Sequence, residues 1–99
     1  MSSENLHEKQ HDMKKETIDI HRAIVSLCEE LDAWDWYNQR VDAVSNHDLK
    51  KILIHNRNEE KEHAAMLIEW LRRNDNFFEG QLKEYLFTDK SIADIERES

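Results

Sequence analysis

Apolar residues recur every three or four positions along the first long segment of the chain. This segment runs from about Asp12 to Ala43, and neither proline nor glycine interrupts it. Its apolar line consists of Ile20, Ile24, Leu27, Leu31, Trp34, Tyr37 and Val41. Such a period is typical of an amphipathic helix that turns one face toward a core. At 1.5 Å per residue, the segment predicts a helix roughly 45 Å long.

A second periodic segment follows, from about Asp48 to Asn74. Its inward line consists of Leu49, Leu53, Asn56, Glu60, His63, Leu67 and Trp70, so three consecutive members are polar. Between the two segments, Ser45, Asn46 and Asp48 favour a turn and a helix N-cap. Because a short loop between long helices makes them antiparallel neighbours, the main unit is predicted to be a helical hairpin.

The rest of the chain carries weaker signals. The stretch "FFEGQLKEYLF" predicts a third, shorter helix near residues 79–87. The charged tail "TDKSIADIERES" has only Ile92 and Ile95 to anchor it and is expected to be mobile. We therefore expect a flexible N-terminus over residues 1–11, followed by one helical domain over residues 12–99 that ends in a mobile tail.

Composition supports an all-α fold that associates with itself. With no proline and one glycine, Gly80, the chain lacks the turn-forming residues that β-hairpins and β-sandwiches require. Its 99 residues suffice for one small domain, and they are 38% hydrophobic and 36% charged. Long helices of this composition usually leave an apolar stripe that another chain must cover.

The charge balance narrows the classes of partner. Fourteen basic and 22 acidic residues give a net charge of −8, which attracts cations and repels nucleic acids and anionic membranes. The single cysteine, Cys28, cannot form an intrachain disulfide, and no apolar run approaches the roughly 20 residues that span a bilayer. We expect a soluble, cytoplasmic protein that binds neither nucleic acid nor membrane.

Three polar residues on the inward faces form the candidate site. Glu60 and His63 lie about 300° apart around the second helix, so they share one face within one turn. On the first helix, Glu30 falls between Leu27 and Trp34 in the same spacing. A buried, unpartnered carboxylate costs several kcal/mol, so a divalent cation is the simplest explanation of this pattern.

This set corresponds to half of a di-iron site. Di-iron carboxylate bundles take one Glu from each of two helices and a Glu-x-x-His motif from each of the other two. The chain supplies one of each, so a second copy related by a two-fold axis would complete a ferritin-like four-helix bundle. Mixed oxygen and nitrogen ligands suit iron(II), manganese or zinc, and Tyr37 is in reach as a hydrogen-bond donor behind the ligands.

Three stretches also resemble a known family. They are "HRAIVSLCEELDAWDWYNQRVDA", "ILIHNRNEEKEHAAMLIEWLRRND" and "YLFT", which are similar to the encapsulated ferritins of bacteria and archaea over about residues 14–95. The resemblance implies a ferroxidase that oxidises iron(II) with dioxygen at a di-iron centre formed between two chains. It makes Glu30, Glu60 and His63 the direct ligands and places Tyr37 behind them. Zinc, manganese, cobalt or calcium are expected substitutes for iron.

The same resemblance carries expectations about assembly. It implies homodimers arranged in a ring-shaped decamer that works inside an encapsulin shell, a nanocompartment in the cytoplasm where the product iron is stored. It also implies an outer site that attracts iron and passes it inward, formed by Glu29, Asp32 and Trp36. The family often has Glu at the position of Asp32, and the Asp side chain is shorter than that of Glu. No shell-docking peptide is visible in the sequence.

Simpler interpretations stay open for each residue. Glu60 and His63 could be a hydrogen-bonded pair that fixes the register of a dimer seam, and Tyr37 could serve packing alone. Glu29 and Asp32 could belong to a solvated acidic face. The alternative function is a non-catalytic helical assembly protein with a structural metal at its dimer interface.

Overall fold

The computed structural model describes residues 5–98, and over that range its regular secondary structure is entirely helical. A 3-10 helix, η2 (Gln10–Asp12), precedes the helices α1 (Lys15–Ala43), α2 (His47–Arg73), α3 (Asn76–Tyr85) and α4 (Ile92–Glu98). The predicted all-α class is confirmed. The flexible N-terminus predicted for residues 1–11 lies partly outside the described residues, and its flexibility stays a prediction.

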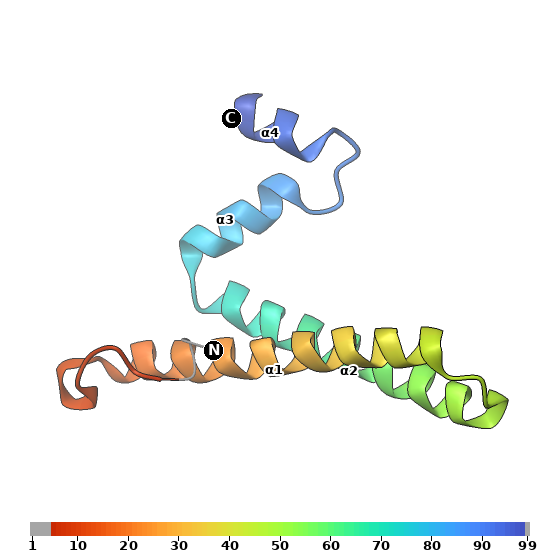
Figure 1. The fold of residues 1–99 in the computed structure, drawn as a ribbon. Coiled ribbons are helices and arrows are strands. Elements are labelled where there is room, and N and C mark those ends of the chain that lie inside the picture. Colours follow the sequence, from red (N-terminus) through yellow and green to blue (C-terminus); the bar gives the residue numbers. More distant parts are fainter. Residues whose placement is uncertain (1–4, 99) are drawn as a thin grey trace.

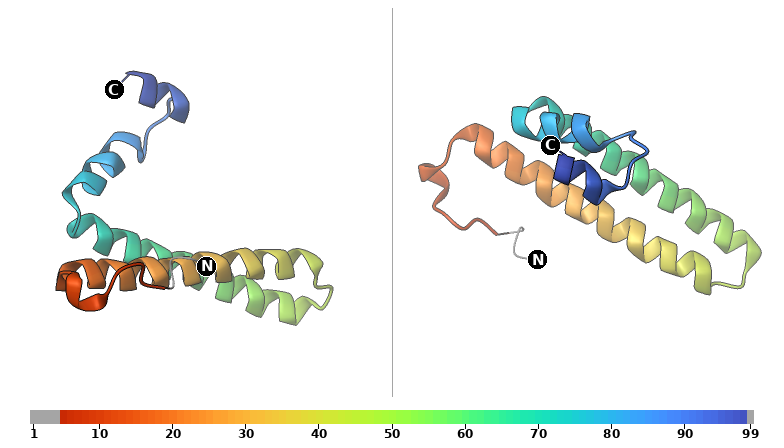
Figure 2. Two further views of the ribbon diagram at one scale, coloured as in Figure 1. Left: turned by 60° about the vertical axis from the view of Figure 1, so that its left-hand side comes forward. Right: turned by 90° about the horizontal axis from the view of Figure 1, so that it is seen from above.

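Helices α1 and α2 form the predicted antiparallel hairpin. They lie side by side along the long dimension of the molecule, and the chain reverses between them through residues 44–46 (Figures 1 and 2). The side-chain oxygen of Asn46 accepts a hydrogen bond of 2.9 Å from the backbone N–H of Leu49. This cap satisfies one of the unpaired N–H groups at the start of α2 and fixes the tight reversal.

The long helices differ from prediction only at their ends. Helix α1 begins at Lys15 rather than near Asp12, because Met13 and Lys14 have extended backbones that separate the helix from η2. Helix α2 runs one residue earlier than expected at both ends. These ends lie far from the candidate site, so its helical register is unaffected.

The third helix was predicted at residues 79–87 and is observed at Asn76–Tyr85, so both predicted ends were wrong. It begins earlier because the Asp75 carboxylate accepts a hydrogen bond of 2.9 Å from the backbone N–H of Phe78. It ends earlier because Leu86 is extended and Phe87 has a φ of 60°, outside helical geometry. Helix α3 leaves the hairpin at the end of α2 (Figure 1).

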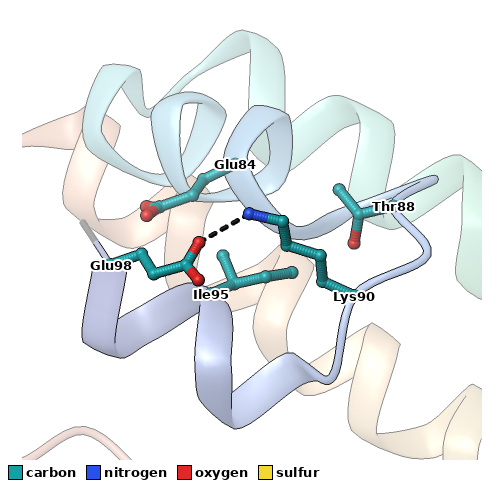
Figure 3. A pocket seen from close by; sticks show the side chains of 5 residues that line it. All are labelled: Glu84, Thr88, Lys90, Ile95 and Glu98. Atoms are coloured by element: carbon teal, nitrogen blue, oxygen red, sulfur yellow. Dashed lines mark hydrogen bonds and ion pairs between the residues drawn. The ribbon is translucent and has the colours of Figure 1, made fainter.

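The charged tail contains a short helix that the sequence analysis did not predict. Helix α4 buries Ile95, whereas Ile92 is 72% exposed. Figure 3 shows the Lys90 ammonium reaching the Glu98 carboxylate, with Nζ and Oε2 2.6 Å apart. Within the tail, Arg97 also pairs with Asp94, so one apolar anchor and two exposed ion pairs stabilise this segment, and its mobility stays a prediction.

The chain has a thin core and much exposed apolar surface. The buried apolar residues are Ile18, Ala23, Val41, Ala64, Leu71 and Ile95. Members of both predicted inward lines are exposed by a third or more, namely Ile24, Leu31, Trp34, Leu49 and Trp70. The hairpin thus leaves much of its apolar stripe uncovered. Within residues 5–98, no helix is long and apolar enough to cross a membrane.

Candidate metal centre

The structure brings Glu30, Glu60 and His63 together where α1 and α2 pack. His63 Nδ1 lies 3.4 Å from an oxygen of Glu30 and 3.7 Å from an oxygen of Glu60. One potential ligand atom from each residue can be chosen so that all lie within 4.8 Å of one another. The three-residue spacing on α2 supplies two of these groups, and the antiparallel helix supplies the third.

The two carboxylates at this cluster oppose each other electrostatically. The side chains of Glu60 and Glu30 are 21% and 25% exposed, so water screens them only in part. Hydrogen bonding to Glu30, followed by partial burial and the negative charge of Glu30, raises the pKa of Glu60, although His63 acts in the opposite direction. A raised carboxyl pKa means that the site favours an added positive charge.

His63 responds to the same negative environment. Partial burial alone would lower the pKa of its imidazole. Hydrogen bonding to Glu30 and the charges of Glu30, Glu60 and Glu59 outweigh that effect, so the pKa of His63 is raised. Either a proton on the imidazole or a divalent metal ion between the ligands would offset the negative charge of the carboxylates.

The donor set fits a transition metal. Two carboxylates and one imidazole are the ligand types that suit iron(II), manganese and zinc. Within residues 5–98, this is the one cluster of three or more His, Cys, Asp or Glu side chains with metal-binding geometry. Three donors leave coordination positions free for ligands from elsewhere.

Tyr37 lies on α1, and its role behind the ligands stays a prediction. It is half-buried on α1, about two turns after Glu30. The guanidinium carbon of Arg40, on the same helix, lies 5.3 Å from the centre of the Tyr37 ring, which is a cation–π contact.

The proposed outer site is not assembled within one chain. Glu29, Asp32 and Trp36 are all exposed on α1, with Trp36 exposed by 55%. In the described part of the chain, neither Glu29 nor Asp32 forms an ion pair, and the pair belongs to no metal-binding cluster. The role of these residues in passing iron inward stays a prediction.

Two contacts beside the cluster were not predicted from the sequence. Glu59 pairs with His55 through Nε2 and an oxygen 2.5 Å apart, and its other oxygen lies 4.0 Å from His63 Nε2. The four-residue spacing of His55, Glu59 and His63 was the signal that could have found this chain of groups. The second contact joins Lys61 to Trp34, where the ammonium lies 5.3 Å from the ring centroid.

Comparison with known proteins finds several of similar sequence. An encapsulated ferritin-like protein of Rhodospirillum rubrum is 57% identical over 95 residues, which cover 96% of this chain and 68% of that protein. A ferritin-like protein of Thermotoga maritima is 47% identical over 97 residues, covering 98% of this chain and 85% of that protein. An encapsulin nanocompartment cargo protein of Myxococcus xanthus is 48% identical over 46 residues, or 46% of this chain and 35% of that protein.

A solved structure and a family model point to the same family as these relatives. The crystal structure of a protein from Nitrosomonas europaea has a TM-score of 0.86 and 58% identity, and covers 90% of this chain and 98% of that chain. The family model described as EncFtn-like matches residues 5–89. The chain therefore belongs to the EncFtn-like family of encapsulated ferritin-like proteins.

Proposed function

We propose that the protein is a ferroxidase that oxidises iron(II) to iron(III) with dioxygen at a di-iron centre formed between two copies of the chain. The observation that carries this proposal is the convergence of Glu30, Glu60 and His63 at the packed faces of α1 and α2. Membership of the EncFtn-like family supports the same chemistry. In this reaction iron is the substrate, each iron(II) loses one electron, and dioxygen accepts the electrons.

Two chains are needed because one chain supplies half of the ligands. A ferritin-like di-iron bundle uses four carboxylates and two imidazoles, twice the set found here. The uncovered apolar residues beside the ligands support a second copy, because Leu31 and Trp34 are exposed next to Glu30 on α1. A two-fold axis through this face would bring two identical sets of three ligands together.

Each residue has a chemical role in this scheme. Glu30 and Glu60 supply negative charge that favours iron(III) over iron(II). Each carboxylate has two oxygens and can change how it binds the metal when the oxidation state changes. His63 supplies a neutral nitrogen donor, provided that its ring has lost its proton. Tyr37 would donate a hydrogen bond behind the ligands.

The assembly of the chain and the destination of the iron are part of the same proposal. We propose that dimers form a ring-shaped decamer housed in a cytoplasmic encapsulin nanocompartment, where the oxidised iron is stored. The names of the relatives from Rhodospirillum rubrum and Myxococcus xanthus support an encapsulin shell as partner. Glu29, Asp32 and Trp36 would attract iron(II) from the exposed face of α1.

Anaerobic loading with iron(II), followed by air, tests the oxidation. The wild-type protein should develop iron(III) absorbance faster than buffer alone, and Glu30→Ala or His63→Ala should lose that acceleration. Asp35→Ala and His47→Ala are matched controls, because both side chains are exposed on the same helices outside the cluster. Bound metal without any accelerated rise would overturn the ferroxidase in favour of a structural metal site.

A further inference from the structure

A cation–π contact spans the two helices directly beside the metal cluster. The Lys61 ammonium lies 5.3 Å from the centre of the Trp34 ring. Lys61 follows Glu60 on α2, and Trp34 lies one turn beyond Glu30 on α1. The contact therefore joins the neighbours of both carboxylates that are proposed to bind iron.

The position of this ammonium is unexpected on electrostatic grounds. Glu30 and Glu60 form a concentration of negative charge, and a flexible lysine next to it would ordinarily pair with a carboxylate. In the described part of the chain, Lys61 forms no ion pair within 4.0 Å and lies over the indole instead. Trp is the aromatic side chain that attracts a cation most strongly.

We propose that Trp34 is a positioning residue that holds the Lys61 ammonium on its ring and so prevents this internal cation from competing with the metal ion for Glu30 and Glu60. A lysine released from the ring would compensate the two carboxylates when no metal is present, and the metal would then have to displace it. The inference rests on the proposed metal site, although it does not depend on oxidation of iron there.

Docking of a second copy would reinforce the contact. Trp34 belongs to the apolar line of α1 and is 36% exposed in the single chain. A chain packed on this face would remove water from around the ring, and cation–π contacts strengthen when they are desolvated. The restraint on Lys61 would then be strongest in the same assembly that completes the metal site.

A double-mutant cycle measured with zinc tests the coupling. Full-length wild type, Trp34→Leu, Lys61→Met and the double variant are titrated with Zn²⁺ by calorimetry, because zinc has no redox chemistry. Trp34→Leu should weaken zinc binding by about two- to fivefold, the scale of one exposed ion pair. The double variant should bind zinc as tightly as Lys61→Met alone, since no ammonium is left to compete.

Two conservative variants and salt separate positioning from packing. Trp34→Phe keeps an aromatic face and should lose less affinity than Trp34→Leu, and Lys61→Arg should behave like wild type because guanidinium also stacks on Trp. The loss caused by Trp34→Leu should shrink in about 1 M NaCl, where the competing ion pair is screened. Circular dichroism and sedimentation check that each variant folds and associates as wild type does. Trp34→Met replaces the Leu variant in the cycle if the latter does not fold.

The outcomes distinguish this inference from the proposed function. Equal weakening by Trp34→Leu with and without Lys61 would mean that Trp34 acts by packing alone, which overturns the inference and leaves the ferroxidase proposal intact. Coupled variants in a protein that binds zinc but does not oxidise iron would support the inference and overturn the ferroxidase. Absence of zinc binding by the wild type would overturn both.

Discussion

At the scale of single residues, the Glu30–Glu60–His63 cluster costs stability in the metal-free chain, and the proposed metal would offset that cost. A helical hairpin of this size would gain stability from an apolar side chain at position 60, on the face that packs against α1. The chain instead carries Glu60 beside Glu30, and the hydrogen bond between them, partial burial and the negative charge of Glu30 together raise the pKa of Glu60. Such a conflict between sequence and packing is expected where a ligand provides the compensation.

Replacing Glu60 should therefore not unfold the metal-free chain. We expect Glu60→Gln in the presence of EDTA to keep the helical signal and to unfold at the same temperature as wild type or higher, because one of two repelling carboxylates is gone. Thermal unfolding followed by circular dichroism measures this. Leu71→Ala provides the contrast, since deletion of a buried leucine side chain should cost about 2 kcal/mol or more. Loss of helix in Glu60→Gln would show that the site is chiefly structural.

The sequence could place the candidate ligands because helical periodicity is a strictly local rule. Glu30, Glu60 and His63 each interrupt an apolar line, and the short loop forces the two lines to face each other. The contact of Lys61 with Trp34 could not be predicted, because it depends on side-chain rotamers and on the stagger between helices. Spacing along the chain specifies neither of these quantities.

At the scale of elements, the caps decide where helices begin. Asn46 was predicted to favour the start of α2, and its side chain accepts the bond that confirms this. Asp75 does the same for α3, yet the sequence analysis placed that helix three residues later. The difference arose because the apolar pattern of a short helix is too brief to fix a boundary, whereas a capping side chain does so through one hydrogen bond.

Loss of the α2 cap should destabilise the hairpin measurably. We expect Asn46→Ala to lower the free energy of unfolding by about 1 kcal/mol, because the backbone N–H of Leu49 loses its acceptor. Urea unfolding at fixed protein concentration and with EDTA gives the value. Ser45→Ala is the neighbouring control, since its side chain caps nothing at this end. A loss as large in the control would point to the loop backbone instead of the cap.

The junction of α2 and α3 depends on a carboxylate held between two arginines. Glu69 accepts hydrogen bonds of 2.7 Å from Arg72 and Arg73, and Arg72 also reaches Glu79 on α3 at 3.1 Å. Hydrogen bonding to Arg72, followed by that to Arg73, lowers the pKa of Glu69 to about 2. Glu69 thereby orients the arginine that links the hairpin to α3.

This lowered pKa predicts a pH-dependent difference in stability. The contribution of Glu69 should be fully present above its ordinary pKa of 4.5 and disappear as the pH falls toward 2. Urea unfolding should therefore show Glu69→Gln to be less stable than wild type at pH 6, with the difference narrowing at pH 4 and further at pH 3. Glu62→Gln, an exposed change on the same helix, should give no such narrowing difference. If the difference in stability between Glu69→Gln and wild type stayed constant with pH, the ion pairs of Glu69 would not be its cause.

At the scale of the whole molecule, the chain is more open than a compact domain of its length. Its radius of gyration is 17.3 Å, whereas a compact domain of this length would have about 13 Å. Its accessible surface is 7961 Å², about 2,000 Å² more than expected for its mass. One side of a standard protein interface buries about 800 Å², so the excess accommodates more than one contact per chain. A ring of dimers needs two different contacts per chain, and the open shape supports that proposal.

Assembly should therefore depend on metal. Without metal, the carboxylates of two copies would repel each other across the shared face, whereas divalent ions would turn that repulsion into ligation and tighten the dimer by mass action. Sedimentation at low micromolar protein should show association increasing when Zn²⁺, or iron(II) without oxygen, replaces EDTA. Glu30→Ala should lose most of this response and Asp35→Ala should keep it.

Salt separates the two forces that act on this face. In about 1 M NaCl, the metal-free wild type should associate more strongly than in dilute buffer, because screening weakens repulsion between carboxylates while apolar burial persists. Glu30→Ala should gain less from salt, since it has less repulsion to screen. A distribution of species that ignores both metal and salt would place the ligand cluster away from the contact between copies, and the shared di-iron centre would then have to be abandoned.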